Sequence, residues 1–264
     1  MAHRSCKNAK ILRSIRHYGA TPPMKNEDQI ILVDKPAGIS SFGVVAKVRG
    51  YLKNEFGHKV KVGHTGTLDP FATGLLILLT GKNTKKSNEF LKLDKIYEAT
   101  LKLGEVSTTG DPEGQIQQYL IEGLSEVTTE NEGASPVTTG RSDPSPKLST
   151  VESVINGFIG TITQTPPRFS AIKINGERAY KLARKGQDFE IPSRKVKIYS
   201  IDILNYDYPK LKIRVHCSSG TYIRTLAEDI GKKLNTGAYL TALRRVKIGD
   251  YDVKDAFPLS RFTE

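Results

Sequence analysis

An aspartate in a glycine-rich loop is the residue of this sequence best placed to do chemistry. Residues 61–74 read KVGHTGTLDPFATG, with three glycines, a proline and almost no apolar periodicity, which predicts an ordered loop. Residues 75–80 then form a continuous apolar run of strand length, which predicts a strand buried on both faces. A loop anchored by a buried strand holds its side chains firmly. We therefore expect the loop to present Asp69, whose carboxylate can act as a nucleophile or a base without a cofactor.

The glycines and the proline are expected to shape this loop. Gly63, Gly66 and Gly74 permit backbone conformations closed to other residues, or the close approach of another segment. Pro70 fixes its own φ and biases Asp69 toward extended geometry. An aspartate before a proline often caps a turn, so a purely structural Asp69 is the alternative interpretation.

Composition and charge limit the classes to which this protein can belong. With 264 residues, of which 38% are hydrophobic, the chain can bury a core in one large domain or two subdomains. Forty Lys and Arg against 28 Asp and Glu give a formal charge of +12, which predicts a polyanionic partner such as nucleic acid. No apolar run is long enough to span a membrane, and no apolar segment follows the basic N-terminus. We expect an intracellular, cytoplasmic protein that does not enter the membrane.

Cysteine and histidine usage predicts neither disulfides nor a metal. Cys6 and Cys217 lie far apart and form no CxxC pair, and the five histidines are scattered. We expect no structural metal and no cofactor.

Two elements before the loop are predicted to support it. Residues 30–33 form a short β-prone strand, after which Pro36 and Gly38 mark a turn. Ser40 or Ser41 suits the N-cap of a following helix with valines at helical spacing.

After the loop, residues 95–103 alternate between apolar and polar side chains, which predicts a strand with Tyr97 facing inward. A tyrosine on such a face is usually part of the core. Residues 211–217 predict a half-buried strand, after which Thr221 can cap an amphipathic helix. Arg224 falls in the first turn of that helix, where the helix dipole disfavours a cation, so we expect a specific anionic partner for it.

Two segments have compositions typical of mobile chain. Residues 1–25 carry six cations and no acid, which predicts a basic tail that helps to hold RNA, with an organellar transit peptide as the alternative. Residues 123–146 are rich in Ser, Thr, Gly and Pro and predict a disordered insertion. Order is expected to resume with a capping box formed by Ser149 and Glu152.

The run GHTGTLDPFATGLL, residues 63–76, resembles the catalytic motif of the TruB-type tRNA pseudouridine synthases. Other segments resemble further motifs of this family in the family's order, and the resemblance covers about residues 30–248 apart from the insertion. These segments are Asp34-Lys35, the KxY setting of Tyr97, TPPRFSAIK at 165–173, SGTYIR at 219–224 and ALRR at 242–245.

The resemblance implies roles for individual residues. Asp69 would be the catalytic aspartate, paired with Arg224, and the ring of Tyr97 would stack on the target base. Tyr97 and Arg224 complete the catalytic set.

The same resemblance implies a substrate-binding set of His64, Tyr97, Tyr222, Leu243 and Lys35. His64 would fill or prop the stack vacated by the flipped base, although a structural histidine is the alternative, and Leu243 would close the apolar pocket. Lys35 would buttress the floor of the active site.

The fold implied is α+β, a mixed, largely antiparallel sheet with flanking helices, a central catalytic cleft and an RNA-binding thumb. The basic residues of 164–184 would form that thumb, although basic residues of this kind usually form an ordinary solvated face. We expect a basic tail at 1–28, a catalytic domain at 29–258 with a low-complexity insertion at about 123–147, and a C-terminal tail at 259–264. We expect no small RNA-binding PUA domain of the kind that many relatives carry.

The activity implied is isomerisation of uridine to pseudouridine in the TΨC loop of tRNA, conventionally position 55, without a metal or cofactor. The expected partner is the T-arm stem-loop of tRNA, bound by a monomer that needs no protein partner. Two rivals are a guide-RNA-dependent pseudouridine synthase subunit and a non-catalytic tRNA-binding or folding protein. The sequence departs from the family at Thr108, where many relatives carry an aspartate, which puts a loop-ordering contact there in doubt.

Overall fold

The computed structural model describes residues 26–119, 145–174 and 176–263. The predicted basic tail and the predicted insertion therefore fall, apart from a few residues at their ends, outside the described residues. The chain divides into two compact units, which are described separately here. Unit 1 comprises Met1–Lys95 and Arg244–Glu264, and unit 2 comprises Ile96–Leu243.

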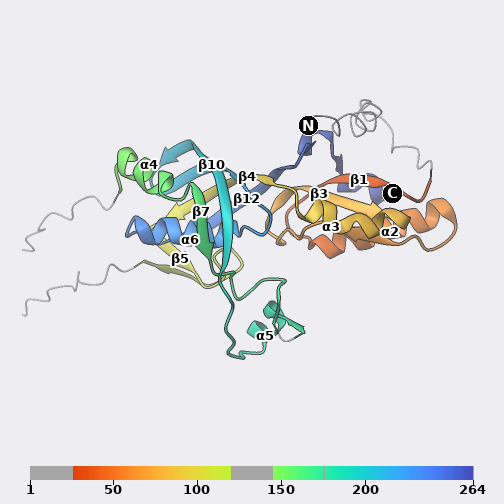
Figure 1. Ribbon diagram of the computed structural model, residues 1–264, viewed down its shortest axis with the longest axis horizontal. Coiled ribbons are helices and arrows are strands. Elements are labelled where there is room, and N and C mark those ends of the chain that lie inside the picture. The colour runs from red at the N-terminus through yellow and green to blue at the C-terminus, as the bar shows by residue number, and fades with distance from the viewer. Residues whose placement is uncertain (1–25, 120–144, 175, 264) are drawn as a thin grey trace, which may run out of the picture. The chain divides into compact units, whose positions relative to one another are not determined.

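Unit 1 is built on a sheet in which the strand order is β14-β1-β3-β12, with β2 added to β3 and β13 added to β12 (Figure 1). Strands β1 and β3 are antiparallel, whereas β3 and β12 are parallel. The elements are β1 (Ile30–Lys35), α2 (Ser41–Phe56), β2 (Val62–His64), β3 (Thr73–Thr80), η1 (Gly81–Lys86), α3 (Ser87–Leu91), the end of β12 (Ala238–Ile248), β13 (Tyr251–Asp252), η2 (Val253–Asp255), β14 (Phe257–Pro258) and η3 (Leu259–Phe262).

Strand β3 is buried on both faces, as its unbroken apolar sequence predicted. Leu76 and Leu78 pack on one face in a cluster with the valines of α2. On the other face, Ile77 packs in a second cluster that contains Phe90. Strand β3, which directly follows the Asp69 loop, is therefore held in place by hydrophobic packing on both of its faces.

Helix α2 begins where its capping residue predicted. The hydroxyl of Ser40 accepts a hydrogen bond from the backbone N–H of Gly43 at 3.0 Å, and the helix ends at Gly57 in the left-handed region. Ser40 is therefore the N-cap, and Ser41 is the first helical residue.

Unit 2 is a mainly antiparallel α+β arrangement. Its strand order is β12-β4-β11-β10-β7, and β10 is antiparallel to both β11 and β7. Helix α4 contacts both β10 and α6. The elements are β4 (Lys95–Leu103), β5 (Glu105–Ser107), β6 (Ile116–Gln118), α4 (Leu148–Asn156), β7 (Gly160–Gln164), β8 (Lys173–Ile174), β9 (Glu177–Arg178), α5 (Ala179–Arg184), β10 (Arg194–Asp207), β11 (Lys210–Cys217), α6 (Ile223–Lys233) and β12.

Between β7 and β10 the chain makes an excursion that carries β8, β9 and α5 and projects from the sheet of unit 2 (Figure 1). This excursion includes nearly all of residues 164–184, the segment expected to form the thumb, and continues to residue 193. Lys173, Arg178, Lys181 and Arg184 are all exposed on it. We call residues 165–193 the thumb from here on.

Two predicted helix caps were wrong. Helix α4 begins at Leu148 after Lys147, without a side-chain cap, so Ser149 is already helical and forms no capping box with Glu152. Helix α6 has Tyr222 rather than Thr221 at its N-cap, because the hydroxyl of Thr221 donates to the carbonyl of Ser218 at 2.9 Å instead. Arg224 nevertheless lies in the first turn of α6, as predicted.

Within the described residues, no helix combines the length and apolar character needed to cross a membrane.

Candidate active site

The loop between β2 and β3 holds Asp69 with backbone contacts on both sides. The hydroxyl of Ser41 donates to the carbonyl of Leu68 at 2.9 Å and accepts from the Leu68 N–H at 2.8 Å. The carbonyl of Asp69 itself accepts from the N–H of Ala72 at 3.2 Å. Asp69 is half-buried. Since its neighbours are fixed through main-chain atoms, the loop sets the position of the Asp69 backbone from which the carboxylate projects.

Lys35 supports the other side of this loop. Its ammonium group donates to the carbonyls of Ile39, Pro36 and Pro70 at 2.7, 2.8 and 3.1 Å. The residue is 0% exposed. A fully buried ammonium that holds three carbonyls supports the loop, and the place of Lys35 in the substrate-binding set stays a prediction. This position agrees with the buttressing role that the motif resemblance implied.

Two of the three glycines in the motif have the predicted backbone conformation. Gly66 and Gly74 have φ values of 131° and 103°, in the region that disfavours side chains. Gly63 does not have a positive φ and lies within β2 in open space, so the prediction was wrong for this residue.

His64 lies at the end of β2, opposite Leu78 of β3, and is half-buried. Its Nδ1 accepts a hydrogen bond from the N–H of Gly66 at 3.4 Å. The imidazole is thus tied to the same loop as Asp69, and its role toward RNA stays a prediction.

Unit 2 contains the predicted aromatic and apolar residues. Tyr97 lies on the buried face of β4 and is 8% exposed. Leu243 lies on the neighbouring strand β12 and is 7% exposed.

Tyr222 is fixed at the start of α6. The amide side chain of Gln164 clamps its main chain, accepting from the Tyr222 N–H at 2.9 Å and donating to its carbonyl at 3.0 Å. The guanidinium of Arg194 lies over the ring, 4.8 Å from its centroid.

Arg224 is held in a buried network within unit 2. Its guanidinium forms an ion pair with Asp111 at 3.2 Å, and the two side chains are 3% and 4% exposed. It also donates to the carbonyls of Thr109 and Phe169 at 3.0 and 2.8 Å. Burial of this cation at the start of a helix is offset by these partners, as its sequence position suggested. The predicted pairing of Arg224 with Asp69 joins residues of different units and stays a prediction.

Thr108 orders its loop without a carboxylate. Its hydroxyl accepts from the N–H of Gln115 at 3.0 Å, and its own N–H donates to the carbonyl of Gln115 at 3.1 Å. A carboxylate that orders this loop is that of Asp111, which accepts from the Thr109 hydroxyl at 2.6 Å and the Glu113 N–H at 3.0 Å. The turn therefore keeps its internal hydrogen bonds, although this sequence has a threonine where many relatives carry an aspartate.

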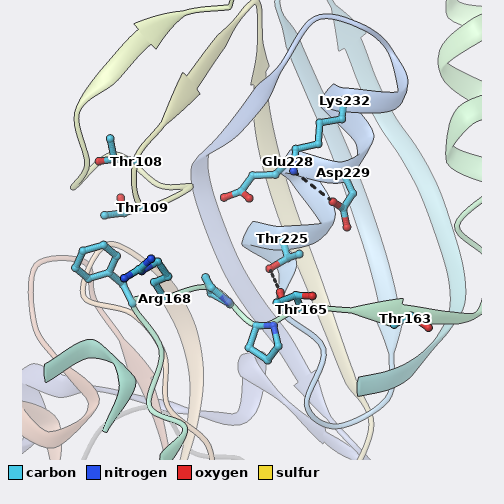
Figure 2. A pocket seen from close by; sticks show the side chains of 12 residues that line it. Thr108, Thr109, Thr163, Thr165, Arg168, Thr225, Glu228, Asp229 and Lys232 are labelled. Carbon is cyan, nitrogen blue, oxygen red and sulfur yellow. Dashed lines mark hydrogen bonds and ion pairs between the residues drawn. The ribbon is translucent and has the colours of Figure 1, made fainter. Parts of the chain in front are cut away.

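A polar cavity of about 440 Å³ lies beside this network in unit 2 (Figure 2). Helix α6, the Thr108–Thr109 turn and the first residues of the thumb form its walls. Its side chains from α6 are Thr225, Glu228, Asp229 and Lys232, and the thumb contributes Thr165 to Phe169. Thr109 and Phe169, whose carbonyls bind Arg224, both line it, so Arg224 ties two of the walls to the helix.

Glu228 is a half-buried acid in the lining of this cavity. Desolvation raises the pKa of its carboxyl above the ordinary value of 4.5; Lys232 opposes that shift, and Asp229 adds to it. Close approach of this side chain depends on Gly110, because a Cβ there would lie 2.3 Å from Oε1 of Glu228.

Glu228→Gln is expected to reduce the decrease in the free energy of unfolding that the wild type shows as the pH rises. A folded-state pKa above the unfolded value means that the folded protein binds more protons, so stability falls as pH rises from about 4.5 through the raised pKa. Glutamine does not ionise, so the variant should gain stability relative to the wild type as the pH rises from about 4.5 through the raised pKa of Glu228. Urea unfolding across this range measures the difference. The exposed Glu152→Gln is the control, and equal pH profiles for Glu228→Gln and the wild type would contradict the expectation.

Three supporting residues were missed or undervalued in the sequence. Ser41 was predicted only as a possible cap, Asp111 was given no role, and Arg245 was quoted in a motif without a role. A signal existed for Arg245, since it occupies an inward position of the largely apolar strand β12. The partners of all three were not readable, because each lies far away in the sequence.

Known proteins share this fold. A chain in the structure of an H/ACA ribonucleoprotein bound to a substrate RNA containing 2'-deoxyuridine aligns with a TM-score of 0.58 and 24% identity, covering 91% of this chain and 56% of that chain. A chain in the crystal structure of a Cbf5-Nop10-Gar1 complex aligns with a TM-score of 0.59 and 25% identity, covering 93% of this chain and 58% of that one. The mixed, largely antiparallel α+β fold is that of the pseudouridine synthases.

Sequence comparison gives a narrower assignment. The model for the N-terminal domain of TruB family pseudouridylate synthases matches residues 53–135 and 117–223, and the model for the C-terminal domain of tRNA pseudouridylate synthase B matches residues 224–264. A tRNA pseudouridine synthase B of Flavobacterium johnsoniae is 42% identical over 92% of this chain and 98% of its own length. Another, from Phocaeicola vulgatus, is 43% identical over 90% of this chain and 93% of its own length. The chain therefore belongs to the TruB family and is an enzyme, a pseudouridine synthase.

Proposed function

We propose that this enzyme converts uridine to pseudouridine in the TΨC loop of tRNA, at position 55, with Asp69 as the catalytic aspartate. The observation that carries the proposal is the Asp69 loop, whose backbone is fixed on both sides of the carboxylate by Ser41 and Lys35. The names of the similar proteins from Flavobacterium johnsoniae and Phocaeicola vulgatus support tRNA as the substrate.

The reaction is an isomerisation in which atoms are conserved. The C1'–N1 glycosidic bond breaks, the uracil turns, and a bond forms between C5 and C1', while C5 loses a proton and N1 gains one. Asp69 acts as nucleophile or base in this sequence and needs no cofactor. An opposite charge close by keeps a carboxylate ionised, which is the role we assign to Arg224.

The target atoms lie within a stacked loop, so the nucleotide must be turned out of the stack before the chemistry. We assign Tyr97 and Leu243 to packing on the extruded base, Tyr222 to the lining of its pocket, and His64 to the space that the base leaves. The fixed main chain of Tyr222 supports a preformed wall, because Gln164 clamps it through both an N–H and a carbonyl.

The test is turnover of an unmodified tRNA transcript with no guide RNA and no other protein. Tritium at C5 of uridine is released into water when C5 bonds to C1', so its release counts turnovers. A transcript with cytidine at position 55 is the control. Release from the first RNA alone supports the proposal. Activity only with an added guide RNA would indicate a guide-dependent subunit, and binding without release would indicate a tRNA-binding or folding protein.

The thumb is assigned to RNA binding because of its exposed cations. Replacing both Lys173 and Lys181 with alanine is expected to weaken tRNA affinity and to reduce the slope of log affinity against log salt by about 2, since each lysine contributes about one phosphate contact. Turnover at saturating RNA should be retained. The double variant of Lys53 and Lys92, which are exposed lysines of unit 1, is the matched control. An unchanged salt slope in the thumb variant would show that these lysines face solvent only.

A further inference from the structure

Arg245 is a buried cation whose side chain bridges the two ends of the Asp69 loop. It is 1% exposed. Its Nε donates to the carbonyl of Leu75 at 2.8 Å, and its NH2 group donates to the carbonyl of Gly66 at 3.0 Å. These carbonyls lie on either side of the segment that carries Asp69. A charge removed from water is tolerated only with such partners, so the guanidinium and the loop depend on each other.

The main chain of Arg245 is held against the same loop. Arg245 is opposite Gly74 where β12 pairs with β3 in parallel. A Cβ on Gly74 would lie 2.3 Å from the carbonyl oxygen of Arg245, so only glycine permits this approach. Arg245 of β12 therefore fixes the loop in two ways. Its main chain packs against Gly74, and its guanidinium donates to the carbonyls of Leu75 and Gly66.

We propose that Arg245 is a positioning residue for Asp69, a role that rests on the proposed catalytic function of Asp69. Ser41 and Lys35 fix the residues directly beside Asp69, whereas Arg245 fixes the distance between the two ends of the loop. A planar guanidinium presents several N–H groups in a rigid fork and can hold two carbonyls at once. An ammonium also has several donors, as Lys35 shows, but they share one nitrogen and lack the planar fork of separate nitrogens.

The consequence is specific to the rate of the chemical step. A catalytic group must be held close to its reacting geometry, and a displacement of about 1 Å can cost about 100-fold in rate. Arg245 is buried and donates to main-chain carbonyls at the two ends of the Asp69 loop, so we expect it to contribute nothing to phosphate binding. Its loss should lower kcat while leaving the affinity for tRNA in place.

The experiment compares Arg245→Met and Arg245→Lys with the wild type on unmodified tRNA. We expect Arg245→Met to lower kcat by about 10- to 100-fold with the tRNA Kd within about threefold. Arg245→Lys should recover part of the rate, because it keeps a donor and the charge but not the fork. Lys247→Met, at an exposed position of the same strand, is the control and should match the wild type.

Hydrogen exchange supplies a readout that does not depend on activity. Peptides covering residues 65–76 should exchange faster in both Arg245 variants, and peptides from α2 should not. If Arg245→Met does not fold, Arg245→Lys carries the test, with an expected loss of about tenfold in kcat. Unchanged kcat, unchanged exchange in the loop, or a loss of tRNA affinity equal to the loss of rate would each overturn the proposal.

The same series separates this inference from the proposed function. If the wild type does not release tritium, or if Asp69→Asn stays active, the proposed function fails. If the wild type is active, Asp69→Asn is inactive and Arg245→Met turns over normally, only the role of Arg245 fails.

Discussion

Asp69→Asn is expected to lower turnover of tRNA by about 10³-fold or more, within the range seen when a catalytic nucleophile is removed. Asparagine has nearly the same shape but is neither a nucleophile nor a base of comparable strength. The loop should stay in place, because its fixed points are main-chain atoms bonded to Ser41, Lys35 and Arg245. Binding should change by no more than about threefold, since phosphate contacts supply most of the affinity for RNA.

The measurement is single-turnover tritium release together with a binding titration on the same transcript. Glu55→Gln, which neutralises an exposed carboxylate of α2, is the control for loss of one negative charge. Activity of Asp69→Asn near that of the wild type would refute the assignment of Asp69 as the catalytic aspartate. It would favour the plain alternative in which this aspartate only shapes the turn before Pro70.

Arg224→Ala is expected to have the second largest effect, a loss of about 10²-fold or more in kcat with a much smaller change in tRNA affinity. The side chain is 3% exposed, so it is poorly placed to contact a phosphate directly. Its guanidinium holds Asp111 and the carbonyls of Thr109 and Phe169, and in the proposed mechanism it also orients Asp69. A preorganised charge beside the reacting group acts on the transition state rather than on binding.

Stability must be separated from catalysis in this experiment. Removing one partner of a buried ion pair commonly costs about 3–5 kcal/mol of stability. Turnover is therefore measured well below the melting temperature of each variant, and Asp111→Asn serves as the matched variant that disturbs the same pair from its other side. A rate loss in Arg224→Ala much larger than that in Asp111→Asn supports a role beyond the pair. If affinity fell while turnover stayed intact, Arg224 would be an RNA ligand instead.

Local patterns were sufficient where one segment decides its own structure. The apolar run of residues 75–80 predicted a strand buried on both faces, because residues 75–79 have no polar side chain that would need solvent. The alternation of residues 95–103 predicted that Tyr97 faces inward, since side chains of a strand alternate between its faces. Ser40 was a correct cap, because capping depends on atoms within three residues.

The wrong caps show the limit of that local logic. Ser149 and Thr221 both have side chains suited to capping, yet α4 starts one residue before Ser149 and α6 starts after Tyr222. At the second site, Gln164 satisfies the main chain of Tyr222 from 58 residues away. The main chain at the start of this helix is thus held by a side chain from a distant part of the sequence, which a local capping pattern does not show.

The sequence by itself determined the candidate catalytic residue and the family to which the protein belongs, because the motif around Asp69 is one continuous run. Only the tertiary structure decided which residues hold that motif. Ser41, Lys35 and Arg245 contact it although they are separated from their partners by 27, 35 and 179 positions in the sequence. It likewise decided that Asp111 is the partner of Arg224 within unit 2, 113 positions apart. The physical reason is that a buried charge or carbonyl must find a partner somewhere in the fold, and the sequence states the need without stating where it is met.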